Sequence, residues 1–488
     1  MNRLMHVTLL VLLALLLSTY LIGCGGSSNG SLAGIDGSGA PITSASGTVN
    51  GFGSVIVNGV RYHSDKAKIL INDQLQTEDS LHTGYQVKVT GTLNTDGTGN
   101  ATTIEFHPNL IGAITQIDLQ KEQLTLLGQT VQITNTTVFD VAISPNYLDG
   151  LKVSDVILVS GHFDGNNMVT ATRIELAPLK SHQIMGYVSN LNETNFTFTL
   201  NQLTINYSAA SLTAFDNNRV KNGLLVSAAG TLDTNGVFQV QAMTHLQTDF
   251  SSEIKSADIE GIITRFSSSN DFDIAGIACG TNGQTTYENG AQINLMLGSS
   301  LKINGAINGS GQLVAKHIEF HLRVTNEIVG EVSNVSALIP GAINTGSFQI
   351  SDAMIKTTAT TAYEDNSDDN LRRFNFADIH VGNFVKVSGY STPTEFIATK
   401  IARGKLDDQH ELELRYEGLI TNLEPHSFRI FGRSVVTTST TEIKNITGES
   451  LTEAEFILLA PNQKVSVLGI LKMGIFTATR VEIKAQDN

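Results

Sequence analysis

The clearest candidate for chemistry in the sequence is a short alternating run of histidine and glutamate. His317, Glu319 and His321 occupy every second position of AKHIEFHLRV. Alternate residues of a β-strand point to the same face, and imidazole and carboxylate groups are both zinc ligands. A polar outward face at a strand edge gives the same pattern far more often. Ile104-Glu105-Phe106-His107 repeats the end of the run without its first histidine, so we expect a structural face and no metal.

Acidic residues form a second set of candidates for ligand binding. A Thr-x-[Phe/Tyr]-[Asp/Glu] motif recurs, and such an acidic residue usually caps the following turn. Two clusters suggest calcium, but the sequence contains neither an EF-hand loop nor an acidic nonapeptide repeat. We therefore expect turn caps and solvated loops. The motif ends in Asp140, Asp216, Glu288 and Glu364, and the clusters are Asp365, Asp368, Asp369 and Asp407, Asp408.

The sequence motifs of nucleophilic and phosphate chemistry are missing. No Gly-x-Ser-x-Gly occurs, and Gly51-Phe52-Gly53-Ser54 precedes a hairpin strand rather than a helix. No Gly-x-x-x-x-Gly-Lys-[Ser/Thr] phosphate loop is present either. We expect a protein that is not an enzyme and needs no cofactor.

The elements that position these residues follow a repeat. In LHTGYQVKVTG, the pattern Leu81, Gly84, Val87, Val89 and Gly91 has five further copies with identical spacing, followed in each case by an [Ala/Val]-x-x-[Ile/Val/Met] motif. Such self-similarity is typical of repeat architectures. The terminal glycines of the copies are Gly91, Gly161, Gly230, Gly305, Gly389 and Gly469.

Each unit reads as a small β domain. A Gly-x-[Val/Ile] strand opens it, and a hairpin follows, clearest in SVIVNGVRY with its Asn58-Gly59 turn. A short helix precedes the repeated strand in the last unit, with Ser450 as its expected N-cap. The leading glycine suits a left-handed position, and the trailing glycine suits a bulge.

This order predicts an all-β chain of six five-stranded barrels that resemble the OB-fold, with a short helix in some units. Whether the units stack as a rod or behave as separate beads stays open. The predicted boundaries are a signal peptide 1–23, a Gly/Ser-rich tether 24–46, and units 47–108, 109–180, 181–250, 251–325, 326–405 and 406–488.

The N-terminus predicts the location. A positive start and an apolar run over residues 7–17 are typical of a secretory signal. The run ends in Leu21-Ile22-Gly23-Cys24, which resembles a bacterial lipobox and implies lipidation of Cys24. Gly25 in place of aspartate implies sorting to the outer membrane. Cys279 has no histidine or cation beside it in the sequence, so we expect a buried, unreactive side chain.

The lipobox, GFGSVIVNGVRY and the repeated strand together resemble a family of bacterial envelope lipoproteins built from tandem small β domains of unknown function. The resemblance covers residues 45–488 and implies class and location, with no catalytic residue.

Charge and composition narrow the function. The net charge is −15. Nucleic-acid binding requires a basic patch, and the sequence shows none. The leading hypothesis is a non-enzymatic, lipid-anchored outer-membrane module that binds an envelope protein or polysaccharide or serves envelope architecture. A carbohydrate or extracellular-matrix binding lipoprotein is the alternative. Sugars commonly stack on aromatic side chains, and the absence of tryptophan weakens this alternative. An envelope hydrolase is the third, and it would require one unit with a buried pair of histidine and acid.

Overall fold

The computed structural model describes residues 41–484 except 120, 145, 165–167, 179–181, 214, 323, 325, 337–343, 351–352, 392–394, 405–411, 431–432, 462 and 473–474. Residues 41–488 form one compact unit. The predicted signal peptide, Cys24 and most of the tether lie outside the described residues. β1 begins at Ile42, ahead of the unit boundary predicted at residue 47.

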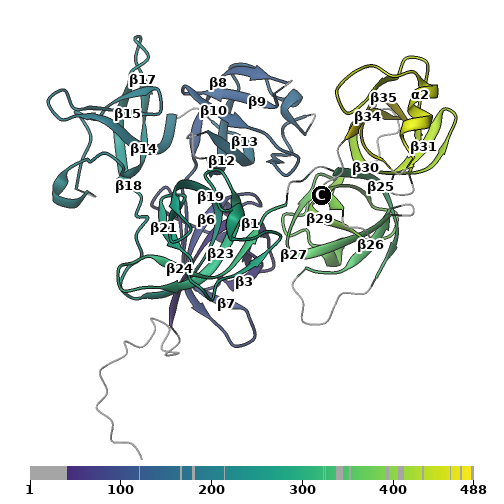
Figure 1. Ribbon diagram of the computed structural model, residues 1–488. Coiled ribbons are helices and arrows are strands. Elements are labelled where there is room, and N and C mark those ends of the chain that lie inside the picture. The colour runs from purple at the N-terminus through teal and green to yellow at the C-terminus, as the bar shows by residue number, and fades with distance from the viewer. Residues whose placement is uncertain are drawn as a thin grey trace, which may run out of the picture. The chain divides into compact units, whose positions relative to one another are not determined.

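The described chain is nearly all β, as predicted, and divides along the sequence into groups of strands (Figure 1). The first group has β1 (Ile42–Gly51), β2 (Val55–Val57), β3 (Val60–His63), β4 (Lys68–Ile71), β5 (Gln74–Gln76), β6 (Gln86–Leu93) and β7 (Gly99–Phe106). The second has β8 (Leu110–Asp118), β9 (Gln123–Leu126), β10 (Gln129–Gln132), β11 (Val138–Phe139), β12 (Val156–Phe163) and β13 (Val169–Leu176). The third has β14 (His182–Asn192), β15 (Thr197–Leu200), β16 (Leu203–Asn206), β17 (Leu225–Leu232) and β18 (Phe238–His245).

The second half of the chain repeats this order. The fourth group has β19 (Ile254–Ser268), β20 (Asp271–Ile274), β21 (Ile277–Gly280), β22 (Thr286–Glu288), β23 (Ser300–Ile307) and β24 (Leu313–Phe320). The fifth has β25 (Asn326–Val335), β26 (Ser347–Ile350), β27 (Ala353–Asp365), β28 (Phe384–Ser391) and β29 (Phe396–Gly404). The sixth has β30 (Leu412–Glu424), β31 (Ser427–Ile430), β32 (Arg433–Val436), β33 (Glu442–Lys444), α2 (Glu453–Leu459), β34 (Lys464–Lys472) and β35 (Ile475–Lys484).

One circuit of strand pairing recurs in these groups. In the fifth group, β25-β26-β27-β29-β28 closes into a barrel, with β27 and β29 parallel and the other neighbours antiparallel. The first group has the same circuit through β1, β2, β3, β7 and β6. Equivalent pairings are present in the second, third, fourth and sixth groups.

Four of these circuits are joined in two pairs by direct strand pairing. β1 runs parallel to β19, from Ile42 opposite Ile254 to Ser46 opposite Ile259, which merges the first and fourth groups into one sheet. β8 pairs with β14 and merges the second and third groups. Strand groups that are distant in sequence are therefore direct neighbours.

Buried apolar side chains fill the interior of the circuits. Val87 and Val89 are 2% and 1% exposed, and the Asn58-Gly59 turn joins β2 and β3 with Asn58 at φ 54° and Gly59 at φ 79°. Both predictions are confirmed. Each core cluster stays within one or two groups.

The two glycines of the repeated strand have the predicted roles. The leading position is left-handed in Gly84, Gly223, Gly298 and Gly382, and Ser154 adopts the same conformation at φ 79°. The trailing glycine lies at a register shift in every copy. Each trailing glycine approaches a backbone carbonyl of the next strand too closely for a side chain.

The helical prediction needs a correction. Thr452, not Ser450, is the N-cap of α2, because its hydroxyl accepts a hydrogen bond from the Glu455 amide while the Glu455 carboxylate accepts one from the Thr452 amide. Ser450 instead forms a β-bridge with Lys444. α2 packs on the strands of the last group through Phe456, whose ring lies 5.6 Å from that of Phe428.

Short 3-10 turns precede the repeated strand in the other groups: η2 (Glu78–Ser80), η3 (Leu148–Gly150), η4 (Asp216–Asn218), η5 (Gln292–Asn294) and η6 (Phe376–Asp378). Among the described residues, no helix combines the length and apolar character that crossing a bilayer requires.

Candidate functional site

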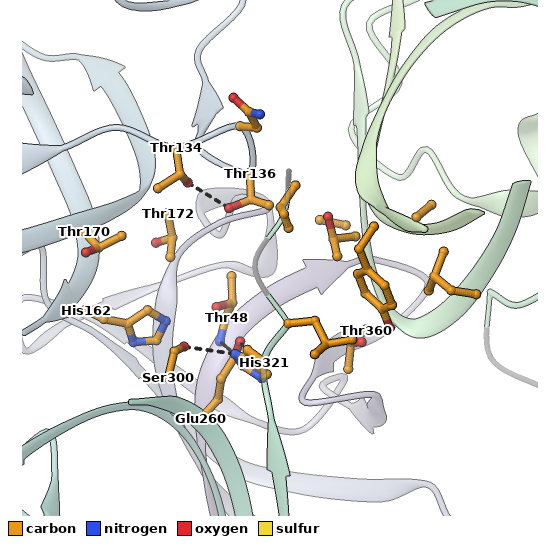
Figure 2. Close-up of a pocket in the computed structure, with 18 of the residues that line it drawn as sticks. Thr48, Thr134, Thr136, His162, Thr170, Thr172, Glu260, Ser300, His321 and Thr360 are labelled. Atoms are coloured by element: carbon orange, nitrogen blue, oxygen red, sulfur yellow. Dashed lines mark hydrogen bonds and ion pairs between the residues drawn. The ribbon is translucent and has the colours of Figure 1, made fainter. Parts of the chain in front are cut away.

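A wide cleft of about 1660 Å³ lies between strands of several groups and is lined by hydroxyl, amide and charged side chains together with apolar ones (Figure 2). Thr48 of β1, His162 of β12 and Glu260 of β19 lie on one side. Thr136 follows β10, and Thr360 lies in β27. We call this feature the cleft.

The threonines of the cleft belong to a turn that the repeat builds. The Thr137 hydroxyl accepts a hydrogen bond from the Thr134 amide at 3.0 Å and donates one to the Ala171 carbonyl at 2.8 Å. The two recurring sequence motifs are therefore hydrogen-bonded to each other. The same pair of bonds is made by Thr285, Thr361 and Thr441.

These turns bring further hydroxyl groups to the cleft. The hydroxyls of Thr134 and Thr136 lie 2.9 Å apart, and those of Thr358 and Thr360 lie 3.1 Å apart. All four residues line the cleft. Hydroxyl groups can exchange hydrogen bonds with a polar ligand, and the cleft also carries charged side chains such as Lys121, Glu122 and Arg480.

A cluster of ionisable groups lies where β1 pairs with β19. The Thr48 amide donates to Glu260 Oε2 at 3.0 Å, which extends the pairing of the two strands through a side chain. Burial alone would raise the pKa of Glu260, but His321, His162 and the Thr48 amide outweigh it, so the pKa is lowered. Glu260 is therefore ionised near neutral pH. We call this place, including Asp258 and Lys302, the seam.

His162 is the group of the seam held neutral near pH 7. Burial lowers its pKa, although the charge of Glu260 opposes this shift. Its Nε2 lies 3.1 Å from Gln86 Nε2, which requires an unprotonated ring nitrogen as the acceptor.

Ser300, His321 and Glu260 lie in an order that bears on the hydrolase alternative. Ser300 Oγ lies 3.2 Å from His321 Nδ1, and His321 Nε2 lies 3.9 Å from Glu260 Oε1 (Figure 2). The second distance is too long for a hydrogen bond. Ser300 and His321 are also joined by a backbone hydrogen bond of 3.0 Å as neighbours on adjacent strands, which accounts for their contact without chemistry.

The rest of the seam joins three charged or polar side chains. Asn58 Nδ2 donates to Asp258 Oδ1 at 2.9 Å, and Lys302 Nζ lies 3.7 Å from Asp258 Oδ2. Lys302 Nζ also donates to the Asn58 backbone carbonyl at 2.6 Å. Burial raises the pKa of Asp258 to about 6, against the opposing effect of Lys302 and Asn58.

The predicted zinc candidate is not assembled. His317 Nε2 lies 3.4 Å from Glu288, whereas His321 follows the end of β24 and faces Glu260. Glu319 lies opposite Lys302 in the ladder of β23 and β24. Within the described parts of the chain, no three His, Cys, Asp or Glu side chains are placed to hold a metal ion.

The acidic residues have mixed outcomes. Asp140 caps its turn as predicted, accepting from the Ala142 amide at 2.8 Å. Glu364 instead pairs with Lys400 at 3.0 Å, where both side chains are buried. The prediction of a solvated loop is wrong for Asp365, which is buried and bonded by Arg403. Asp407 and Asp408 lie outside the described residues.

The chain has two cysteines, and the structure describes one of them. Cys279 is fully buried, and burial raises its pKa to about 12, as expected for an unreactive thiol. Cys24, the predicted lipidation site, lies outside the described residues.

Sequence reasoning missed the seam residues. Asn58 was interpreted only as a turn former, and Asp258, Glu260 and Lys302 were not singled out. The available signal is Asp258-Ile259-Glu260, two alternating carboxylates on one strand. Their partners come from distant strands, so neighbouring residues do not indicate the pairing.

Comparison with protein families identifies the repeat. Residues 40–105, 111–175, 260–319, 333–402 and 417–482 each match a family described as a domain of unknown function, DUF5666. The matched segments cover well over half of the chain, so the chain belongs to this family. The third strand group, β14 to β18, is not among the matched segments. No curated protein matches the chain.

Proposed function

We propose that this protein is a lipid-anchored module of the bacterial outer membrane, built from six OB-like barrels, that binds an envelope component in the cleft. It acts as a binding or structural module and not as an enzyme. The observation that carries the proposal is the cleft itself, which strands from several groups frame with hydroxyl and amide side chains.

The pairing circuit supports the OB-like assignment. In OB-folds, five strands form a partly open barrel whose face and loops bind polymers. Here the third strand of each circuit runs parallel to the fifth, and a helical turn or helix precedes the fourth in every group. Function does not follow from fold alone, so the argument rests on the cleft.

Anchoring rests on the sequence at Cys24. An acyl chain contributes about 0.8 kcal/mol for each buried methylene, and stable attachment needs more than one chain or a second signal. Partners are therefore the membrane, through lipid on Cys24, and an envelope protein or polysaccharide. The net charge of −15 argues against nucleic acid.

The carbohydrate alternative lacks support from aromatic side chains. Among the described tyrosines and phenylalanines, only Phe196 and Phe266 are exposed. They belong to two different strand groups, so an aromatic groove does not recur from group to group. For the hydrolase alternative, Ser300, His321 and Glu260 are candidates in the described chain, with the distances given above.

Membrane fractionation of cells that express the full chain tests the anchoring. We expect the wild type in the outer-membrane fraction and Cys24→Ser in the soluble periplasmic fraction, because the variant has no acceptor for lipid. Cys279→Ser is the matched control and should stay with the membrane. A Cys24→Ser protein that remains in the outer membrane, or a wild type that is soluble, would overturn the proposal.

A further inference from the structure

Lys302, Asn58 and Asp258 bring an amine, a carboxamide and a carboxyl group together at the seam. Asp258 lies between the other two, with one oxygen 2.9 Å from Asn58 Nδ2 and the other 3.7 Å from Lys302 Nζ. Lys302 Nζ is also held at Asn58 by the 2.6 Å bond to its backbone carbonyl. The three groups come from β19, β23 and the turn between β2 and β3.

Their surroundings are largely closed to water. Asn58 is 2% exposed, and the side chains of Lys302 and Asp258 are 18% and 21% exposed. Gly47 makes room for the carboxamide, because a Cβ at that position would lie 1.8 Å from Asn58 Oδ1. This oxygen is buried and accepts no hydrogen bond from the described residues. The carboxamide is thus held beside Asp258 with its carbonyl oxygen unengaged, and the amine is held at the backbone carbonyl of the same residue.

The reaction requires a proton acceptor beside the amine. A lysine amine is nucleophilic only when neutral. The raised pKa of Asp258, about 6, makes this carboxyl group an unusually good proton acceptor for its class. Proton transfer from Lys302 to Asp258 gives a neutral amine and a protonated acid side by side.

We propose that Lys302 and Asn58 join in an intramolecular isopeptide bond, formed by the protein itself with Asp258 as proton carrier. The inference goes beyond the proposed function, since it concerns a covalent modification of the chain and does not depend on a ligand or on anchoring.

The reaction balances without an added reagent. The Lys302 Nζ lone pair attacks Asn58 Cγ, and a C–N bond forms. Asp258, protonated by the first transfer from Lys302, delivers that proton to Asn58 Nδ2 and takes the second proton that Nζ loses. The Cγ–Nδ2 bond breaks, ammonia leaves and takes up the second proton from Asp258 as ammonium, and Asp258 returns to its ionised starting state. The product is a secondary amide between the two side chains.

The bond would lock together strands that are distant in sequence. Residues 58 and 302 lie in the two groups that share the β1–β19 pairing. A covalent link between them closes a long loop and restricts the unfolded chain. For a protein in the cell envelope, such a link would resist mechanical separation of these strands.

A second pair in the chain provides a matched control. Lys386 occupies the position of Lys302 in its copy of the repeated strand, and its Nζ lies 2.9 Å from Glu327. The Glu327 carboxylate accepts from the Ser388 hydroxyl at 3.3 Å. This copy therefore has a similar ion pair, but the neighbour of its carboxylate is a hydroxyl group rather than a carboxamide. We therefore expect no isopeptide bond at Lys386.

Mass spectrometry of the purified full chain tests the proposal. We expect an intact mass lower by one ammonia than the processed sequence requires, and a branched tryptic peptide that joins the segments around residues 58 and 302. Trypsin should fail to cleave after Lys302. Recovery of both segments as separate, unmodified peptides would overturn the proposal, and so would Asn58 deamidated beside a free Lys302.

Variants identify the atoms involved. Lys302→Arg keeps the positive charge but should restore the missing mass, and Asp258→Asn should do the same because it cannot carry the proton. Lys386→Arg should retain the branched peptide. The thermal unfolding midpoint should fall more in Lys302→Arg than in Lys386→Arg. A branched peptide that persists in Lys302→Arg, or disappears in Lys386→Arg, would contradict the assignment.

Discussion

At the residue scale, one threonine per turn explains why two sequence motifs recur together. Its hydroxyl accepts a bond from the start of its own turn and donates to the last strand of the circuit, as Thr361 does to Ala398 at 2.7 Å. The sixth group lacks the aromatic and acidic positions of the motif, yet Thr441 makes the same bonds. In the second, fourth, fifth and sixth groups the hydroxyl is therefore the constant part of the motif.

Removing this hydroxyl should destabilise its barrel. Thr361 is 1% exposed, and leaving buried partners without a hydrogen bond costs about 1–3 kcal/mol. We expect Thr361→Val to lower the free energy of unfolding by that amount, measured by urea denaturation. Thr360→Val, on the exposed side of the turn, is the control. Equal effects of the two substitutions would contradict the role given to Thr361.

Asp365 links the stability of the fifth group to acid pH. Burial opposes ionisation, but hydrogen bonds from Arg403, Ser367 and Leu371 prevail and lower the pKa of Asp365 to about 2. A carboxyl group with a lowered folded-state pKa stabilises the fold above its unfolded pKa, and this contribution is lost as the pH falls through the folded pKa.

We therefore expect the loss of at most about 2.5 kcal/mol between roughly pH 4 and pH 2, at about 1.4 kcal/mol for each pKa unit. Hydrogen exchange of β27 and β29 as a function of pH measures it. Asp365→Asn should lower the protection at neutral pH and remove this part of the pH dependence. An unchanged pH dependence in Asp365→Asn would exclude Asp365 as the titrating group.

At the scale of elements, the two glycines of the repeated strand are required for different reasons. Gly382 has φ 88° with open space around its missing side chain. Gly389 lies at a bulge, where a Cβ would come within 2.1 Å of the Ile397 carbonyl oxygen. Glycine is required at the first position because of its backbone conformation, and at the second because a side chain would clash.

This difference predicts unequal costs of alanine. Gly382→Ala should cost about 1–2 kcal/mol, the penalty for a left-handed residue with a side chain. Gly389→Ala should cost more, because the backbone carbonyl has to move and strain of this kind adds roughly 1–3 kcal/mol or more. Thermal unfolding of both variants measures the difference. A larger loss in Gly382→Ala would refute the steric argument.

The strand order was predictable because its signals are local. The Asn58-Gly59 turn, the alternation around Val87 and the two glycines each depend on neighbouring residues. The predicted N-cap lies two residues from the observed one because Ser450 and Thr452 are both good caps. The hydrogen bonds between Thr452 and Glu455, together with the bridge of Ser450 to Lys444, decide between them.

At the scale of the whole described chain, side chains join groups that are distant in sequence. The Arg372 guanidinium lies over the Phe52 ring at 4.1 Å and donates to the Leu81 carbonyl at 3.0 Å. Contacts like this one and those of the seam could not be predicted, because they depend on the pairing of whole strands rather than on local pattern. For the same reason the cleft was not foreseen.

Arg372 and Arg373 form a matched pair that tests this contact. We expect Arg372→Ala to increase hydrogen exchange in residues 78–81, because it removes a cation–π contact worth about 0.5–2 kcal/mol and a buried hydrogen bond. Arg373 is 61% exposed and pairs with Glu78, so Arg373→Ala should change exchange little, as surface ion pairs contribute about 0–1 kcal/mol. Equal exchange in both variants would count against the contact.

The central claim is that an envelope component binds in the cleft, and site-specific photocrosslinking in intact cells tests it most directly. A photoreactive residue in place of Thr136 lies in the cleft, and one in place of Thr234 lies in an exposed turn of the third group. The account predicts that the first captures one defined envelope protein or polysaccharide, identified by mass spectrometry, and that the second does not. Capture of the same molecules from both positions, or of nothing from position 136, would contradict it.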